Sequence, residues 1–329
     1  MTGTAHPDDG RWMAAALTLA ARGAARTTPN PNVGCVIVKD GCVVGRGWTQ
    51  PGGRPHAEAM ALAQAGATAR GATAYVTLEP CAHESARGPA CADSLIAAGV
   101  ARVVAALTDP DPRTAGQGLA RLRAAGIAVI DGVASAAARA AMAAWLSRIE
   151  RGRPFITLKL ATSLDGMIAR ADGQSRWITG ERARTHGHLE RARHNAILVG
   201  HGTLGADAPR LDVRLPGLEA RSPQRLVLTS GPGPEGWTAV ASPEATDALA
   251  GVDSLLVEGG AQTAAAFLRA GRVDRLLHYQ APILIGVGRS ALADIGLTDL
   301  AKAHGRWRLA DSRMLGSDRL AVYEAVRED

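Results

Sequence analysis

The stretch that decides the fold is PHAEAMALAQAG, residues 55–66, taken together with TLEPC at residues 77–81 and with the cysteine at position 91. One histidine and two cysteines can fill three positions around a tetrahedral Zn²⁺ and leave the fourth open to water, which then ionises near neutral pH. We therefore predict a zinc site made by His56, Cys81 and Cys91. Glu58, an acidic residue that stays off the metal, is the expected proton carrier.

The spacing of His56 and Glu58 constrains the local structure. Residues two apart on a regular helix do not face each other, so both side chains reach one point only if His56 precedes the helix. Prolines and glycines at 51–55 come before it, and an apolar run at 57–65 follows. We expect a helix over 57–65. Cys81 follows a strand-like run at 73–78, and a helix N-terminus close to it would lower its thiol pKa.

The ordered set of these residues matches the signature of zinc nucleobase deaminases, although nine residues separate the two cysteines instead of two. The alternative is a buried histidine with two unrelated cysteines, which requires three ligand types and a proton carrier to coincide. The other two cysteines, Cys35 and Cys42, flank a hairpin turn at 40–41 and could face each other. We interpret them as small core residues and not as a redox pair.

Length and composition limit the class of protein. A chain of 329 residues is long enough for two domains, and four cysteines do not make a disulfide framework. No apolar run approaches the roughly 20 residues of a membrane span, and the polar N-terminus lacks the features of a signal peptide. We expect a cytoplasmic protein without a membrane partner. The net charge of +6 is dispersed, which favours a phosphorylated small molecule over a nucleic acid.

Helical and strand-like segments alternate along both halves, which predicts α/β domains. The first half contains helices at 11–22, 57–65, 91–98, 118–125 and 135–149, and strands at 33–39, 42–48, 73–78, 102–107 and 127–130. The second half contains helices at 181–194 and 261–270, and strands at 155–160, 196–199, 225–229, 254–257, 273–279 and 319–323. We place the domains at 1–148 and 149–329. The second half has no cysteine, which excludes zinc–thiolate chemistry there.

Two corners of the second half are candidate anion sites. In VEGG, residues 257–260, a buried strand ends and a helix begins, so free backbone N–H groups are offered to a phosphate. The corner GHGT at 200–203 is similar, although ordinary strand–helix corners also use glycine. Arginines crowd residues 182–193; a solvated face is the simpler interpretation, but Arg191 could contribute to a phosphate pocket. From the residues alone, this half is an α/β domain that binds a phosphorylated ligand.

At this point the sequence resembles the bifunctional riboflavin-biosynthesis deaminase–reductases over nearly its whole length. In the first half the resemblance rests on TPNPNVGCVIV at 28–38, HAE at 56–58, TLEPC at 77–81 and AAGV at 97–100. In the second half it rests on KLATSLDG at 159–166, WIT at 177–179, ADAP at 206–209 and VEGG at 257–260.

The resemblance implies a cytidine-deaminase-like three-layer α/β/α domain, followed by a dihydrofolate-reductase-like α/β domain. The first would use Zn²⁺ to deaminate 2,5-diamino-6-(5-phosphoribosylamino)pyrimidin-4(3H)-one. The second would use NADPH to reduce 5-amino-6-(5-phosphoribosylamino)uracil to its ribitylamino product. A homodimer is also implied. The rival interpretations are an RNA or nucleobase deaminase with a non-catalytic second domain, and a zinc-stabilised scaffold without activity.

Matching positions suggest roles for further residues. Asn30, Asn32 and His83 would surround the pyrimidine. The cofactor would contact Thr162, Trp177, Thr203, Asp207, Ser230, Gly259 and Gly260. The substrate of the reductase would contact Ser175, Arg191, Leu211, Arg214 and Glu258. The chain departs from the family pattern in a cysteine spacing one residue longer, in Ala208 where a second acidic residue is usual, and in a short, poorly matching stretch at 215–253.

Overall fold

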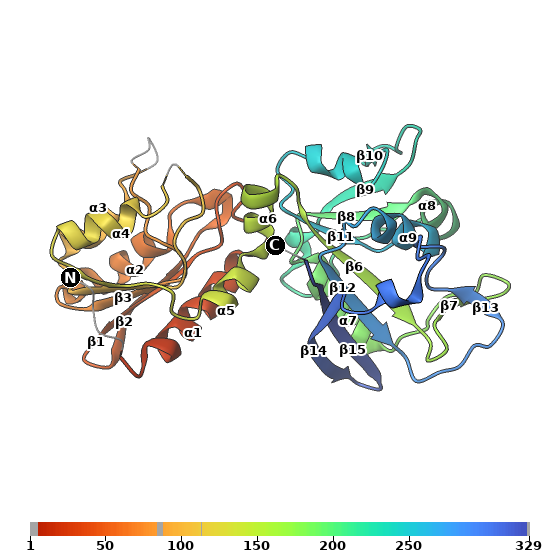
Figure 1. Cartoon of the computed structure of the whole chain (residues 1–329), viewed down its shortest axis with the longest axis horizontal. Coiled ribbons are helices and arrows are strands. Elements are labelled where there is room, and N and C mark those ends of the chain that lie inside the picture. The colour runs from red at the N-terminus through yellow and green to blue at the C-terminus, as the bar shows by residue number, and fades with distance from the viewer. Residues whose placement is uncertain (1–5, 84–87, 113, 328–329) are drawn as a thin grey trace. The chain divides into compact units, whose positions relative to one another are not determined.

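The computed structural model describes residues 6–83, 88–112 and 114–327, except the side chain of Asp207, and divides into two compact units (Figure 1). The first unit spans Met1–Gly152 and the second spans Arg153–Asp329. The division falls just after α6 (Ala143–Arg151). No helix of the described residues is long and apolar enough to cross a membrane.

The first unit is built on a five-stranded sheet in the order β2-β1-β3-β4-β5. Its strands are β1 (Gly34–Lys39), β2 (Cys42–Trp48), β3 (Thr73–Val76), β4 (Arg102–Ala105) and β5 (Ala128–Ile130). Its other helices are α1 (Asp9–Ala20), α2 (Ala57–Ala65), α3 (Cys91–Ala98), α4 (Gln117–Ala124) and α5 (Ser135–Ala141). β1 is antiparallel to β2 and β3, whereas β3, β4 and β5 run parallel.

Glycines on the two hairpin strands let helices approach both faces of this sheet. A Cβ on Gly34 would lie 1.9 Å from the carbonyl oxygen of Ala16 in α1, and one on Gly47 would lie 2.1 Å from that of Ala57 in α2. Gly34 pairs with Trp48, so Gly47 faces the opposite side of the sheet. The helices α1 and α2 therefore cover opposite faces, which confirms the predicted α/β/α layers.

The second unit is built on an eight-stranded sheet in the order β10-β9-β8-β11-β6-β12-β15-β14. These strands are β6 (Phe155–Thr162), β8 (Ala196–Gly200), β9 (Gln224–Leu228), β10 (Thr238–Val240), β11 (Ser254–Val257), β12 (Arg275–Gln280), β14 (Trp307–Leu315) and β15 (Asp318–Ala325). The helices are α7 (Glu181–Arg191), α8 (His201–Asp207) and α9 (Ala261–Arg269). A separate two-stranded ribbon pairs β7 (Met167–Arg170) with β13 (Gly288–Ser290). All neighbouring pairs from β10 to β12 are parallel, and β15 and β14 extend the sheet antiparallel.

The interpretation of the first two cysteines was wrong in two respects. Cys35 pairs with Gly47, and Cys42 pairs with Lys39, so the two cysteines do not face each other. Cys35 is a buried core residue as predicted, but Cys42 is exposed. The reason is that Cys42 follows the turn directly and opens β2 at its exposed end.

Candidate active sites

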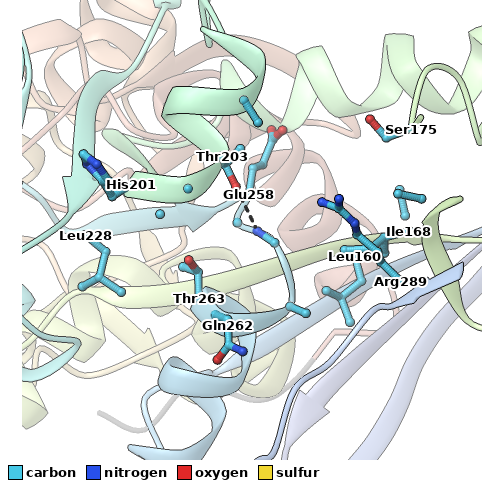
Figure 2. A pocket seen from close by; sticks show the side chains of 18 of the residues that line it. Leu160, Ile168, Ser175, His201, Thr203, Leu228, Glu258, Gln262, Thr263 and Arg289 are labelled. Carbon is cyan, nitrogen blue, oxygen red and sulfur yellow. Dashed lines mark hydrogen bonds between the residues drawn. The ribbon is translucent and has the colours of Figure 1, made fainter. Parts of the chain in front are cut away.

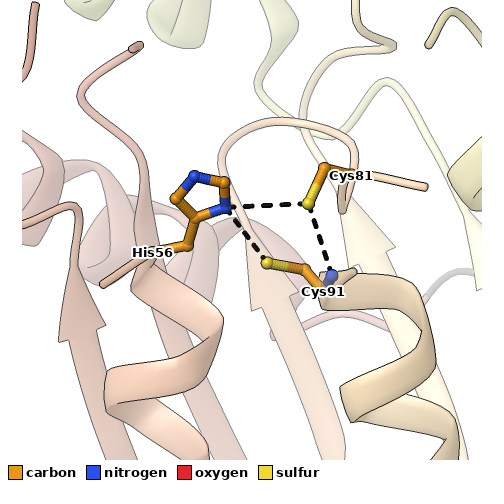
Figure 3. A group of neighbouring side chains, drawn as sticks. All are labelled: His56, Cys81 and Cys91. Carbon is orange, nitrogen blue, oxygen red and sulfur yellow. Dashed lines mark hydrogen bonds between the residues drawn. The ribbon is translucent and has the colours of Figure 1, made fainter. Parts of the chain in front are cut away.

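The three predicted zinc ligands meet at one point of the first unit (Figure 3). His56 is the N-cap of α2 with an extended backbone, and Cys91 is the first residue of α3. The His56 Nδ1 atom lies 3.3 Å from Cys91 Sγ and 3.7 Å from Cys81 Sγ, and all three atoms lie within 4.8 Å of one another. Zinc bonds of ordinary length at a tetrahedral angle give an N–S separation of roughly 3.5 Å. The donor set and its spacing therefore fit zinc with one position left for water.

The start of α3 also prepares a thiolate. The thiol of Cys91 and its backbone N–H, 3.3 Å from the Cys81 sulfur, hold the pKa of Cys81 down to about 4. The hydrogen bond between the two sulfur groups, together with burial, raises the pKa of Cys91. The thiol of Cys81 therefore loses its proton readily. The thiol of Cys91 would lose its proton when a metal ion binds, because only the thiolate is a metal ligand. The predicted effect of a nearby helix start on Cys81 is confirmed.

A cavity of about 180 Å³, here called the first-unit cavity, adjoins the ligand cluster. Glu58 lines it from α2 but is only 3% exposed, and burial raises the pKa of this carboxyl group. A carboxylate with a raised pKa exchanges protons more readily near neutral pH than an ordinary one. The arrangement suits a group that takes a proton from water and returns it.

The three residues predicted around the pyrimidine are not all in this cavity. Asn30 and His83 line it, and the amide nitrogen of Asn30 lies 3.1 Å from both the Gly53 carbonyl and Nε2 of His56. The Asn30 amide nitrogen donates to the Gly53 carbonyl, and a bond to the Nε2–H of a zinc-bound His56 would use the amide oxygen of Asn30 instead. Asn32 instead donates to the carbonyls of Ala20 and Ala141, and it is not among the described residues that line the cavity.

Glu79, which sequence analysis left without a role, holds the cavity wall in place. Its carboxylate accepts four backbone N–H groups, from Asp109 at 3.0 Å, Gly116 at 2.9 Å, Gly118 at 2.8 Å and Leu119 at 3.1 Å. These bonds cap the start of α4 and fix the segment that carries Asp109 into the cavity. No motif indicates such a role, because the four donors come from a distant loop and the first turn of α4.

The larger cavity of the second unit, about 740 Å³, lies at the carboxyl ends of β6, β8 and β11, where ligands bind in open α/β sheets. Of the predicted cofactor residues, Thr203, Gly259 and Gly260 line it (Figure 2). The Gly260 N–H donates to the Thr203 hydroxyl over 3.3 Å. A Cβ on Gly259 would lie 2.4 Å from Cβ of Thr263, so only glycine permits this turn. The volume and the exposed backbone fit a dinucleotide.

The smaller cavity of the second unit, about 440 Å³, is basic. It is lined by four of the predicted substrate residues, Ser175, Arg191, Arg214 and Glu258, and also by Trp177. Arg191 binds Glu258 through two hydrogen bonds of 2.9 Å, and Lys159 lies 4.0 Å from the same carboxylate. Burial alone would raise the pKa of Glu258, but Lys159 and Arg191 outweigh it and lower that pKa to about 2. Glu258 is therefore ionised in any physiological solution.

The remaining predicted contacts lie beside the cavities or outside the described part. Thr162 is buried and bonded to His278, and Ser230 is exposed beyond the end of β9; neither is among the described lining residues. Leu211 is a core residue, only 4% exposed. The side chain of Asp207, at the end of α8, lies outside what the structure describes. Trp177 lies in the smaller cavity and not among the described residues of the larger one.

Comparison with known proteins identifies the family. Residues 154–236 and 239–321 match the family described as RibD C-terminal domain, and residues 7–107 match the cytidine and deoxycytidylate deaminase zinc-binding region. The riboflavin biosynthesis protein RibD of Escherichia coli K12 is 42% identical over 360 aligned residues, which cover 94% of this chain and 97% of the relative. The chain belongs to the RibD family.

Solved RibD structures agree with this assignment. RibD of Acinetobacter baumannii is 37% identical, with a TM-score of 0.85, and covers 97% of this chain and 99% of its own. The Thermotoga maritima diaminohydroxyphosphoribosylaminopyrimidine deaminase/5-amino-6-(5-phosphoribosylamino)uracil reductase is 31% identical, with a TM-score of 0.87 and the same coverage. The predicted two-domain fold is confirmed. As a RibD-family protein, the chain is a deaminase and reductase of riboflavin biosynthesis that uses zinc and NADPH.

Several basic residues of the second-unit cavities were not predicted to contact a ligand. Lys159 lines both cavities, Arg184 and His188 line the smaller one, and Arg289 lines the larger one. Lys159 lies within the KLATSLDG motif that carries the RibD resemblance, so its position was a usable signal. Arg289 lies on a three-residue strand in a loop-rich stretch, where no periodicity points to a site.

Proposed function

We propose that the first unit deaminates 2,5-diamino-6-(5-phosphoribosylamino)pyrimidin-4(3H)-one and that the second unit reduces the resulting 5-amino-6-(5-phosphoribosylamino)uracil with NADPH. We assign residues 1–148 to the deaminase domain and residues 149–329 to the reductase domain. The observation that carries the proposal for the first unit is the His56–Cys81–Cys91 cluster beside the buried Glu58. For the second unit it is a pair of adjoining cavities that share lining residues.

In the deamination, zinc bound by His56, Cys81 and Cys91 supplies a Lewis acid that makes a water nucleophilic at neutral pH. Glu58 would move two protons of the water in turn: the first goes to the ring nitrogen when the water attacks, and the second goes from the resulting hydroxyl to the amino group, which leaves as ammonia as the carbonyl forms. Asn30 holds the imidazole in place, and His83 and Asp109 offer polar contacts to the pyrimidine from the cavity wall.

In the reduction, bound NADPH would supply a hydride to C1′ of the ribosyl group, where the C1′–O4′ ring bond breaks and the ring oxygen takes up a proton to become a hydroxyl. The ammonium group of Lys159, at the boundary of the two cavities, stabilises the negative charge that develops on the sugar oxygen. Glu258 orients Lys159, while Arg191 and Arg214 bind the substrate phosphate. The contacts predicted for Thr162, Trp177, Asp207, Ser230, Leu211 and Asn32 stay predictions.

Assays of the two reactions on one preparation test this proposal. Ammonia release from the diaminopyrimidine and NADPH oxidation with the deaminated compound are measured separately, before and after treatment with a zinc chelator. We expect both activities at first, and loss of ammonia release alone after chelation. Deamination of tRNA but not of the pyrimidine would favour the RNA deaminase with a non-catalytic second domain. No ammonia from either substrate would favour the scaffold.

We also propose that the protein is a cytoplasmic homodimer that does not bind nucleic acid. Support for self-association comes from the loop that precedes β13, where Leu284 is 75% and Val287 is 86% exposed. Light scattering after gel filtration tests the dimer, and replacing both residues by serine should give a monomer if this surface is the interface.

A further inference from the structure

The two cavities of the second unit fix the direction in which the cofactor lies. They share Lys159, Ala161, Ile168, Ser175 and Glu258. Hydride transfer requires the reacting atoms of nicotinamide and sugar to approach within about 3–3.5 Å. The nicotinamide must therefore lie at this shared end of the larger cavity, and the rest of NADPH must extend away from it.

The opposite end of the larger cavity is formed by the ends of β8 and β9. His201, Gly202 and Leu228 lie there. Figure 2 shows His201 and Leu228 on one side and Ile168, Ser175 and Arg289 on the other, with Thr203 and Thr263 between them. The adenosine half of NADPH, which carries the 2′-phosphate, consequently lies toward His201.

Three basic side chains line this cavity, and two of them have no partner. Lys159 is held near Glu258. His201 and Arg289 make no side-chain hydrogen bond or ion pair with any residue of the described part of the chain, and both are exposed toward the cavity opening. The Arg289 guanidinium lies against the backbone of Gly173, where an added Cβ would be 3.0 Å from Nη2. Basic side chains in a cavity for an anionic ligand, which can donate N–H hydrogen bonds, are expected to contact its phosphates.

The order of the two basic side chains matches the order of the phosphates on the cofactor. Starting from nicotinamide, NADPH carries first the pyrophosphate and then the 2′-phosphate. Starting from the shared end, the cavity presents first Arg289 and then His201. We propose that Arg289 binds the pyrophosphate and that His201 binds the 2′-phosphate, which makes His201 the residue that distinguishes NADPH from NADH. This assignment rests on the proposed reductase function of the second unit.

The roles of His201 and Arg289 can be distinguished by comparing NADPH with NADH, because NADH has the pyrophosphate but lacks the 2′-phosphate. Dissociation constants of NADPH and NADH are measured by fluorescence titration for the unaltered protein and for the variants His201→Gln and Arg289→Gln. We expect His201→Gln to weaken NADPH binding about tenfold and to leave NADH binding unchanged. We expect Arg289→Gln to weaken both by a similar factor, so that the ratio of the two constants stays the same.

Fragments and controls sharpen the comparison. Adenosine 2′-monophosphate should lose affinity in His201→Gln but not in Arg289→Gln, since it has the 2′-phosphate and no phosphate of the pyrophosphate. His304→Gln and Arg46→Gln remove the same groups from exposed positions outside these cavities and should change neither constant. Thermal midpoints check that each variant is folded.

Two results would overturn the assignment while leaving the reductase function intact. One is an equal loss of NADPH and NADH affinity in His201→Gln, or no loss at all. The other is a changed NADPH-to-NADH ratio in Arg289→Gln. If the unaltered protein binds neither dinucleotide, the reductase function fails, and the assignment fails with it.

Discussion

Two buried glutamates of the first unit have opposite tasks because their surroundings differ. The Glu79 carboxylate accepts hydrogen bonds from four backbone N–H groups, and these bonds fix the loop and the start of α4. Glu58 lies beside the sulfur ligands in a nearly dry position, and burial raises its pKa. A carboxylate that is saturated with donors is a poor proton carrier, whereas one with a raised pKa is a good one. The environment, not the residue type, assigns the roles.

The variant Glu58→Gln tests the proton-carrying role. It keeps the shape of the side chain but cannot accept a proton, so ammonia release should fall by about 10²-fold or more. NADPH oxidation with the deaminated substrate should stay at its original rate, which also serves as the control for folding. Unchanged ammonia release would remove Glu58 from the mechanism.

The variant Lys159→Met tests charge stabilisation in the reductase. Methionine preserves most of the apolar length but removes the ammonium group, so NADPH oxidation should slow by about 10²-fold. Ammonia release should not change. If only KM rises while kcat is kept, Lys159 contributes to binding and not to the transition state.

The zinc ligands could be predicted because the chemistry requires particular residue types in a particular order. His56, Glu58, Cys81 and Cys91 were all recognised from that order. Arg289 and Glu79 escaped recognition because their positions depend on which distant backbone or cavity the fold brings to them, whereas Lys159 was missed although it lies in the KLATSLDG motif. Asn32 shows the reverse case: its amide is bonded to Ala20 and Ala141, which the motif alone does not reveal.

At the level of elements, Glu79 connects a strand end to a helix start and to the loop between them. The variant Glu79→Ala leaves four buried or half-buried N–H groups without an acceptor, and we expect a loss of about 3 kcal/mol of unfolding free energy. The control is Asp93→Ala, which removes only an exposed ion pair with Arg121 and should cost less than about 1 kcal/mol. Chemical denaturation followed by circular dichroism measures both. Equal losses would contradict the anchoring role.

Helices and strands with a regular spacing of apolar residues, or with a clear terminating residue, were predicted almost to the residue. The helices 57–65 and 91–98 and the strand 254–257 agree with α2, α3 and β11. The expected helix 135–149 is divided at Met142 into α5 and α6, although its alanine-rich sequence contains no breaker. β14 was missed because it is an edge strand with most residues exposed, so no buried face marks its sequence.

On the scale of the whole molecule, acid should destabilise the second unit. Glu258 has a pKa of about 2 in the folded protein, below its ordinary value of 4.5, so its contribution is complete above pH 4.5 and is lost as the pH falls toward 2. The contribution is about 3 kcal/mol. The variant Glu258→Gln should therefore unfold at a lower temperature at neutral pH and show a flatter dependence of its thermal midpoint between pH 5 and about pH 2.5. A parallel dependence in both proteins would contradict this.

The lining shared by the two second-unit cavities has a pharmacological consequence. Lys159, Ser175 and Glu258 border both spaces, so the two ligands would come closest to each other at these side chains. One synthetic compound that joins a nicotinamide mimic to a phosphorylated pyrimidine could fill both spaces together. Each half would then raise the effective concentration of the other, and a bisubstrate inhibitor built on this junction should bind far more tightly than either half alone.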